Sequence, residues 1–180
     1  MDNRIMRLLP EILNQGGTSM CSSYAVAGLA NYFLGTERVD AKKLYQETTF
    51  SGGNTLGSVL AKATINGIPL TSGKRVKIKS SQRVLPGALN LVKVLEKNPV
   101  VFSYQIPLGI GMRCLPPDYI MQWPLETHSM VLLDYDEKTK CFWVANSYGD
   151  QWADRGYFRI PAMRMDTPYC NDVYSFTLEI

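Results

Sequence analysis

Four polar side chains in the sequence have the types and the spacing that thiol chemistry requires. The stretch 14–23 is NQGGTSMCSS, and it places Gln15 six residues before Cys21, where a glycine-rich turn leads into a predicted helix. A cysteine attacks as its thiolate, and the positive end of a helix favours that charged form. A buried structural cysteine needs no such surroundings. The spacing therefore indicates a nucleophile.

The partners that such a nucleophile needs lie in the second half of the chain. His128 stands in THSMVLLDY at the head of a predicted strand, and Asn146 stands in FWVANSYGDQW at the end of another. One sheet could present both side chains at the same edge, where Asn146 would fix the tautomer of the imidazole that exchanges protons with Cys21. The amide of Gln15 and the backbone N–H of Cys21 would make two donors for the oxyanion of an acyl intermediate.

Hydrophobic periodicity predicts helices in the first half of the chain and strands in the second. The predicted helices lie within 21–35, 39–49, 54–69 and 88–99. The predicted strands cover 100–106, 129–136, 140–147, 156–160 and 173–180, and a loop is predicted at 80–87. Ser19 and Asp40 are candidate N-caps of the first two helices. The pattern indicates an α+β fold, with a helical lobe at approximately 1–75 and an antiparallel, barrel-like β-rich lobe at 76–180 in one domain.

Composition limits the classes of protein to which the chain can belong. Its 180 residues, 46% of them hydrophobic, can bury a sizeable core without disulfides or metals. The net charge is only +3, and the basic run at 74–79 alternates like a solvated strand, so we expect no nucleic-acid partner. No stretch approaches the roughly 20 apolar residues that span a bilayer, and no signal peptide is evident, so we expect no membrane partner.

The cysteine pattern indicates neither a disulfide framework nor a metal centre. The four cysteines are Cys21, Cys114, Cys141 and Cys170, and none of them lies in a CxxC pair. A zinc site made from three of them and His128, the one histidine, is improbable because no two ligands are close in sequence. We therefore expect no metal and no cofactor, and we expect a monomer.

Several motifs between residues 15 and 157 occur in an order that is characteristic of a known family. After the Gln15–Cys21 pair, SGGNTLGSVLAKATINGI places two glycines before a helix, and ALNLVKVLEKNPVVFSYQI is a helix that runs into a strand. The strand THSMVLLDY carries the histidine, and WVANSYGDQWADRGYFRI is close to an Asn-Ser-Trp-Gly, Trp-Gly, Gly-Tyr pattern. In these motifs the chain resembles the papain-like cysteine peptidases of the C1 type, and the resemblance implies their two-lobe fold.

The resemblance also implies a role for each matching residue. Cys21 would be the nucleophile and His128 the acid and base, while Gln15 would donate to the oxyanion and Asn146 would orient the histidine. Residues that would bind or cover the substrate are Gly52, Gly53, Ser129, Tyr148 and Trp152. Of these, Gly53 would pair with the substrate backbone and Ser129 would line the pocket beside the histidine.

The chain departs from the family pattern at several positions. Ser22 stands where a tryptophan is usual, and Tyr148 replaces the tryptophan that covers the contact between asparagine and histidine. Thr18 and Phe50 stand where two cysteines commonly form a disulfide, which favours a reducing compartment such as the cytoplasm. Because twenty residues precede Cys21, the chain resembles a mature enzyme without the inhibitory propeptide.

The resulting hypothesis is a cysteine endopeptidase that hydrolyses polypeptides through an S-acyl intermediate on Cys21, with His128 as acid and base. Two alternatives use the same cleft. One is a non-peptide amidase or an acyltransferase, and the other is a catalytically silent module that binds a partner. Each residue also has a structural interpretation, since a lone cysteine can be a small buried hydrophobe and NSYGD is also a turn sequence.

Overall fold

The computed structural model describes residues 11–50, 53–107, 114–115 and 125–180. Within these ranges the helices are α1 (Cys21–Leu34), α2 (Ala41–Thr48), α3 (Leu56–Asn66), α4 (Ala88–Leu95) and the 3₁₀ helix η2 (Ala162–Asp166). The strands are β1 (Ile68–Pro69), β2 (Arg75–Val76), β3 (Ile78–Val84), β4 (Val100–Pro107), β5 (Leu125–Asp136), β6 (Cys141–Ala145), β7 (Tyr157–Pro161) and β8 (Cys170–Leu178). The predicted α+β class is confirmed.

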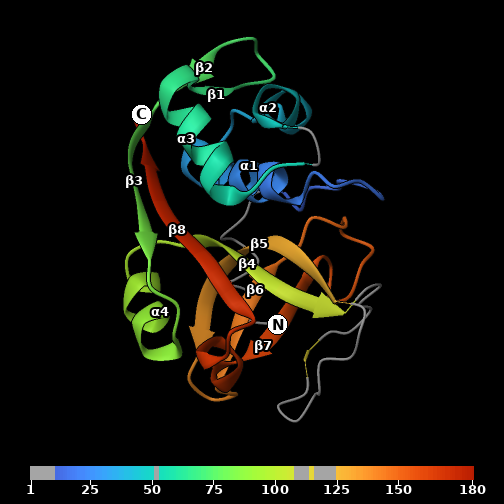
Figure 1. Cartoon of the computed structure of the whole chain (residues 1–180), viewed down its shortest axis with the longest axis vertical. Coiled ribbons are helices and arrows are strands. Elements are labelled where there is room, and N and C mark those ends of the chain that lie inside the picture. Colours follow the sequence, from blue (N-terminus) through green and yellow to red (C-terminus); the bar gives the residue numbers. More distant parts are fainter. Residues whose placement is uncertain (1–10, 51–52, 108–113, 116–124) are drawn as a thin grey trace.

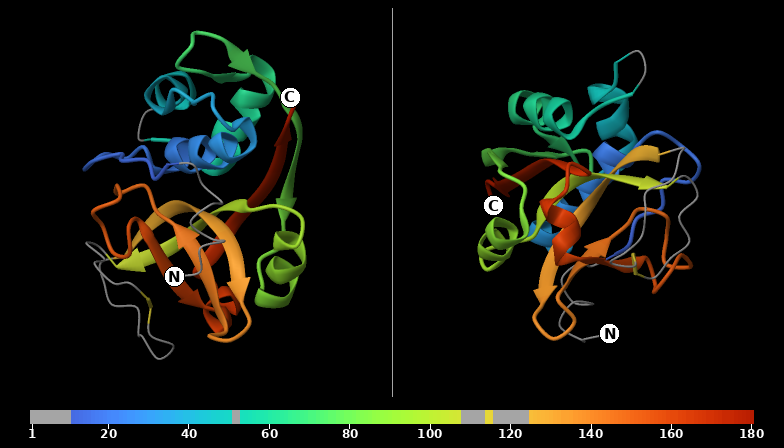
Figure 2. Two further views of the ribbon diagram at one scale, coloured as in Figure 1. Left: turned by 180° about the vertical axis from the view of Figure 1, so that it is seen from behind. Right: turned by 60° about the horizontal axis from the view of Figure 1, so that its bottom comes forward.

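One antiparallel sheet organises the molecule. Its six strands lie in the order β3-β8-β4-β5-β6-β7, while β1 and β2 form a small sheet of their own. Helices α1, α2 and α3 gather with the small sheet at one end of the molecule, and β4 to β7 lie at the other end with α4 (Figures 1 and 2). The strands β3 and β8 run side by side along one edge and join the two ends.

The helix starts follow the local sequence, with one exception that matters for the site. Asp40 caps α2 by accepting a hydrogen bond from a backbone N–H three residues later, as predicted, and Thr55 and Ser58 form a capping box at α3. The prediction for Ser19 is wrong, because α1 follows Met20 and no side chain caps it. Since helix geometry gives the first N–H groups of α1 no acceptor within the helix, they remain available to a ligand.

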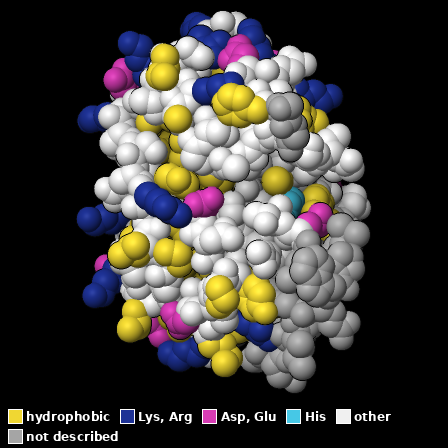
Figure 3. Space-filling model, viewed as in Figure 1, with side chains coloured by type: hydrophobic (Ala, Val, Ile, Leu, Met, Phe, Trp, Pro, Cys, Tyr) yellow, Lys and Arg dark blue, Asp and Glu magenta, His cyan; other side chains and the backbone are white. Residues whose placement is uncertain are grey.

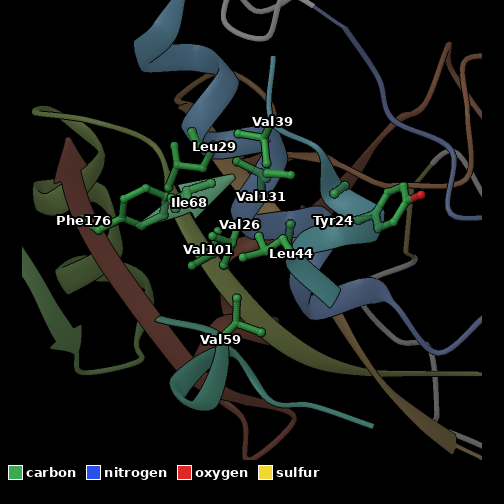
Figure 4. Packing of buried hydrophobic residues seen from close by; sticks show 14 of the residues in the cluster. Tyr24, Val26, Leu29, Val39, Leu44, Val59, Ile68, Val101, Val131 and Phe176 are labelled. Carbon is green, nitrogen blue, oxygen red and sulfur yellow. The ribbon is translucent and has the colours of Figure 1, made fainter. Parts of the chain in front are cut away.

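The two faces of the main sheet bury two different hydrophobic cores. Val101 and Val131 face each other on β4 and β5 and belong to the core that includes α1, whereas their neighbours Phe102 and Met130 belong to the other core. Figure 4 shows the first core, in which side chains from α1, α2 and α3 meet those of the sheet. Burying each large apolar side chain contributes about 1.5–3 kcal/mol, so this core fixes α1 against β5.

Strand β3 covers residues 80–84 of the loop that the sequence predicted at 80–87, so this part of the prediction is wrong. Ser80 pairs with Thr177 and Val84 pairs with Val173, in register with β8. The side chains in the middle of β3 are exposed, because the strand lies at the edge of the sheet. An edge strand of this kind carries no hydrophobic alternation, and the pattern therefore failed to indicate it.

Strand β8 lies between β3 and β4 and contributes to both cores. Val173 is buried in the core of β4 to β7, whereas Phe176 and Leu178 are buried in the core of α1. The predicted lobe boundary near residue 75 stays a prediction. None of the helices in the described part of the chain is long and apolar enough to cross a membrane.

Candidate active site

A pocket of about 660 Å³ lies where the loop before α1 meets the start of β5. Its lining consists of Gln15, Gly16, Gly17, Thr18, Ser19, Cys21, Gly53, Asn54, Glu126, Thr127, His128 and Tyr148. The structure thus brings together three of the four predicted catalytic residues, which are up to 113 positions apart in the sequence. In Figure 3 the histidine, coloured cyan, reaches the surface at mid-height beside hydrophobic and acidic side chains.

Cys21 is the first residue of α1 and is partly exposed in this pocket. The uncapped start of the helix places its unpaired N–H groups and the positive end of the helix dipole beside the sulfur atom. Both favour a negative charge here, on the sulfur itself or on an oxygen atom bound next to it.

Gln15 is held in place by hydrogen bonds at both ends of its side-chain amide. Its Oε1 accepts from the hydroxyl of Ser147 at 2.5 Å, and its Nε2 donates to the carbonyl oxygen of Thr18 at 2.6 Å. The backbone N–H of Gln15 also donates to the carbonyl oxygen of Ser147 at 2.8 Å. Because a carbonyl oxygen can only accept, the amide orientation is fixed, and one N–H of Nε2 remains for a ligand.

His128 and Asn146 form a buried pair behind the pocket. The imidazole is 3% exposed and Asn146 is 4% exposed, and Nε2 of the ring lies 2.6 Å from Oδ1 of the amide. The same Oδ1 accepts the backbone N–H of Ser147 at 2.7 Å. A backbone N–H can only donate, so this amide atom is the oxygen and Nε2 of His128 must carry a proton. In the neutral ring, Nδ1 is then the free basic atom.

The electrostatic surroundings of His128 act in both directions. Burial lowers the pKa of the imidazole, while the hydrogen bond with Asn146 and the negative charge of Glu126 act to raise it, and burial dominates. A thiolate at Cys21 would therefore have to overcome the cost of burying the imidazolium.

Tyr148 and Trp152 lie in series beside the histidine. The ring centroid of Tyr148 is 4.8 Å from that of His128, and Trp152 stands edge-on to Tyr148 at 5.6 Å and to Phe158 at 5.4 Å. Tyr148 lines the pocket, whereas Trp152 does not. Trp152 thus supports the ring that packs on the histidine, and a direct role for it in binding stays a prediction.

Glu126 lines the pocket and was missed by sequence reasoning. It lies two residues before His128 on β5, and its charge and hydrogen bond help to raise the pKa of the Tyr148 hydroxyl to about 12, after burial as the main cause. Cys21 also raises that pKa through its charge, and Glu126, Cys21 and Tyr148 line the same pocket. Period-two alternation could have placed Glu126 on the face of His128, but the predicted strand began at Ser129.

Ser129 is not part of the pocket lining. It is 2% exposed, and its hydroxyl lies 3.0 Å from that of Ser22 on α1 and 3.0 Å from that of Ser103 on β4. The chain of hydroxyls joins the residue after Cys21 to the residue after His128. The predicted role of Ser129 in substrate binding thus finds no support in its surroundings, and a structural role fits its contacts.

The two glycines predicted to bind the substrate are Gly52 and Gly53. Gly52 lies outside the described residues. Gly53 lines the pocket, but its N–H donates to the carbonyl oxygen of Phe50 at 3.1 Å, and its carbonyl oxygen accepts from the N–H of Phe50 at 3.0 Å. Its φ of 115° is accessible to glycine and strained for other residues. A substrate backbone would have to compete with Phe50 for these groups.

The three other cysteines lie outside the pocket, and all four in the chain are free thiols. Burial raises the pKa of Cys170 to about 12, with a further contribution from Asp166. Burial and the neighbouring Cys141 raise the pKa of Cys114. Among the residues that the structure describes, no cluster of three histidine, cysteine or acidic side chains could hold a metal ion. The predicted monomeric state and cytoplasmic location stay predictions.

Neither a model of a known protein family nor a curated protein sequence matches the chain. Solved structures do match. Xylellain, a cysteine protease from Xylella fastidiosa, has a TM-score of 0.79 and 14% identity, with 98% of this chain and 89% of that chain covered. The Carica candamarcensis cysteine protease CMS1MS2, in complex with E-64, has a TM-score of 0.77 and 17% identity over 98% and 97% of the two chains. The bromelain protease of Ananas comosus, in complex with the E64 inhibitor, has a TM-score of 0.77 and 16% identity over 99% and 98%. The chain therefore has the fold of the papain-like cysteine proteases.

Proposed function

We propose that the protein is a cysteine peptidase that cleaves polypeptides through a thioester on Cys21. Three observations support this proposal: the papain-like fold, the pocket shared by Gln15, Cys21 and His128, and the buried pair of His128 and Asn146. The fold alone would suit a silent binding module equally well. The proposal therefore depends on the arrangement of the side chains in the pocket.

The observation that carries the proposal is the double hydrogen bond at Oδ1 of Asn146. It fixes the proton of His128 on Nε2, and so leaves Nδ1 as a base in a pocket that also contains Cys21. A histidine held only for structural reasons needs no thiol across a pocket from its ring. The arrangement matches what an activated nucleophile requires, namely a base whose orientation is set by a third group.

In the first half of the proposed reaction, Nδ1 of His128 takes the thiol proton of Cys21, and the sulfur attacks the carbonyl carbon of the peptide. The oxyanion that forms is stabilised by the free N–H of Gln15 Nε2 and by the backbone N–H of Cys21, which has no acceptor within α1. His128 then gives the proton to the leaving amine, the C–N bond breaks, and the acyl group remains on the sulfur.

In the second half, water replaces the amine. Nδ1 of His128 removes a proton from this water as its oxygen attacks the thioester carbon, and the C–S bond breaks to release a carboxylic acid. The proton returns to the sulfur, so Cys21 and His128 end as they began. The neutral imidazole is the form that accepts these protons, and burial, which lowers the pKa of His128, favours that form.

The decisive experiment combines covalent labelling with product analysis. An epoxide or vinyl-sulfone reagent should label Cys21 and leave Cys114, Cys141 and Cys170 unmodified, as mass spectrometry of the digested protein would establish. Cys21→Ala should lose both labelling and cleavage of a peptide library. Cys114→Ala, which removes another partly exposed thiol, should keep both.

The alternatives predict different products. Labelling of Cys21 without peptide cleavage, but with turnover of small amides, would identify an amidase. Acyl transfer to an added amine that exceeds hydrolysis would identify an acyltransferase. Equal, slow labelling of Cys21 and Cys114 with no turnover would contradict an activated thiolate and leave the binding module.

A further inference from the structure

The described lining of the active-site pocket carries one carboxylate and no lysine or arginine. Of its twelve residues, the titratable ones are Cys21, Glu126, His128 and Tyr148. The remaining lining is made of glycine, hydroxyl and amide residues. The pocket is therefore acidic, although the whole chain has a net charge of +3.

The position of Glu126 on β5 directs it to the same side of the strand as His128. The two residues pair with Ile106 and Tyr104 on β4, and residues two apart on a strand share a face. Glu126 and Cys21 both act on the hydroxyl of Tyr148. Because Glu126 and Cys21 line one pocket, a substrate residue next to a carbonyl carbon at Cys21 could meet the carboxylate.

No cation of the described chain neutralises Glu126. The ion pairs among the described residues involve other carboxylates, those of Glu11, Glu37, Glu47, Glu137 and Asp172. Glu126 acts on the nearby hydroxyl of Tyr148, and a carboxylate can accept about four hydrogen bonds. Glu126 is only partly exposed, and it lines the pocket that a substrate would fill.

We propose that Glu126 determines specificity, and that the cleft selects peptides with a lysine or arginine side chain close to the scissile bond. This inference rests on the proposed peptidase function. The positive head group would donate charge-assisted hydrogen bonds to the carboxylate, and its aliphatic stem would pack on the ring of Tyr148. A neutral side chain of the same shape would leave the carboxylate partly desolvated and without a charged partner.

Peptide pairs that differ only in one charge would test this role. In each pair arginine is replaced by citrulline, its neutral analogue, or lysine by acetyl-lysine, at each position around the scissile bond. For the wild type, kcat/KM should favour the charged peptide by about tenfold or more at one position, the scale of a charge-assisted hydrogen bond. Raising the ionic strength should reduce this preference, because salt screens a partly exposed pair.

The variant Glu126→Gln keeps the shape of the side chain and removes its charge. Its ratio of charged to neutral kcat/KM should fall towards one. Because Glu126 also acts on His128, the variant can slow every substrate, but that effect cancels in the ratio. Glu96→Gln removes a charge from an exposed residue at the end of α4, outside the pocket, and should retain the wild-type ratio.

Three results would overturn the inference. Equal wild-type rates for charged and neutral peptides would contradict it while leaving the peptidase function intact. An unchanged ratio in Glu126→Gln would assign the preference to other residues. Equal rates for charged and neutral side chains, combined with a large loss of rate when the peptide N-terminus is acetylated, would show that the ligand is an α-amino group instead of a side chain. Failure to cleave any peptide would contradict the proposed function itself.

Discussion

The two sides of the active-site pocket are built in different ways. On the sheet side, the geometry depends on side chains, because the tautomer of His128 follows from its bond with Asn146 and its ring packs on Tyr148. On the helix side, it depends mainly on the backbone, because Cys21 occupies the uncapped start of α1. A backbone environment survives most substitutions, whereas a side-chain environment is lost with one. We therefore expect the base to be more sensitive to mutation of its neighbours than the nucleophile.

Side-chain hydrogen bonds also join the two sides. Ser147, which follows the asparagine, binds Gln15 through its hydroxyl, and Ser22, which follows the cysteine, lies 3.0 Å from Ser129, which follows the histidine. The neighbours of the proposed catalytic residues thus connect the helix to the sheet.

The largest loss of activity is expected for a substitution on the sheet side of the pocket. Asn146→Ala removes the group that sets the tautomer of His128, so kcat should fall by about a thousandfold, within the range for general acid–base catalysis. Labelling of Cys21 should also slow. Asn171→Ala, an asparagine at the start of β8 outside the pocket, is the matched control and should keep full activity. A loss below tenfold would mean that the tautomer does not depend on this amide.

A smaller effect is expected for Gln15→Ala. Removing one donor to an oxyanion costs about a hundredfold in kcat, while the start of α1 remains to stabilise the thiolate. Labelling of Cys21 should therefore proceed at nearly the wild-type rate, and Gln82→Ala on the exposed face of β3 should change neither quantity. If labelling falls as far as turnover does, Gln15 supports the loop that positions Cys21 instead of the oxyanion.

The third prediction concerns pH and the sheet side alone. In Cys21→Ala no thiolate can stabilise the imidazolium, so burial should keep the pKa of His128 below its usual 6.5. As the pH falls below 6.5, the unfolded chain takes up this proton before the folded chain does, and the free energy of unfolding decreases. The decrease ends once the folded histidine is also protonated.

Urea unfolding between about pH 8 and about pH 5 would measure this effect. The matched control is Cys21→Ala combined with His128→Gln, which should lose the part of the pH dependence that belongs to the histidine. NMR of the imidazole in Cys21→Ala would give its pKa directly, since the chain has one histidine. A pKa above 6.5 without the thiol would contradict the dominant role of burial.

The smallest expected effect concerns the contact between the hydroxyls of Ser22 and Ser129, which connects the two sides of the pocket. In a double-mutant cycle, Ser22→Ala and Ser129→Ala should show a coupling of about 1 kcal/mol in the free energy of unfolding, the usual value of one hydrogen bond. Ser22→Ala and Ser80→Ala, whose hydroxyls do not meet, should be additive. Additive effects for the first pair would show that the contact contributes nothing to stability.

Much of the fold could be predicted from sequence because local patterns determine it. Helix α1 shows helical spacing and a final glycine, Asp40 caps α2, and the runs that became β5 to β8 alternate or are apolar. The edge strand β3 could not be predicted, because its side chains are exposed and only its pairing with β8 makes it a strand. The start of α1 at Cys21 agrees with the prediction, but its cap does not, because Ser19 has a capping side chain that the structure does not use.

The site was predictable where types and spacing were unusual, as for Gln15 and Cys21. The other parts of the site were not predictable, because contacts between distant parts of the chain determine them. Glu126 becomes a candidate site residue only because it shares a face of β5 with His128. The hydroxyl of Ser129 contacts that of Ser22 because odd-numbered residues of this strand face α1. The backbone groups of Gly53 depend on a pairing with Phe50 that no sequence pattern indicates.

Strand β8 has a consequence for how the molecule unfolds. Because its residues are buried in both cores and its neighbours are β3 and β4, neither core can open without exposing apolar surface of the other. We expect a single cooperative transition, in which slow amide exchange extends from α1 through β5. Cys21 and His128 would then separate only when the whole domain unfolds, so the pocket should stay assembled at any temperature at which the protein remains folded.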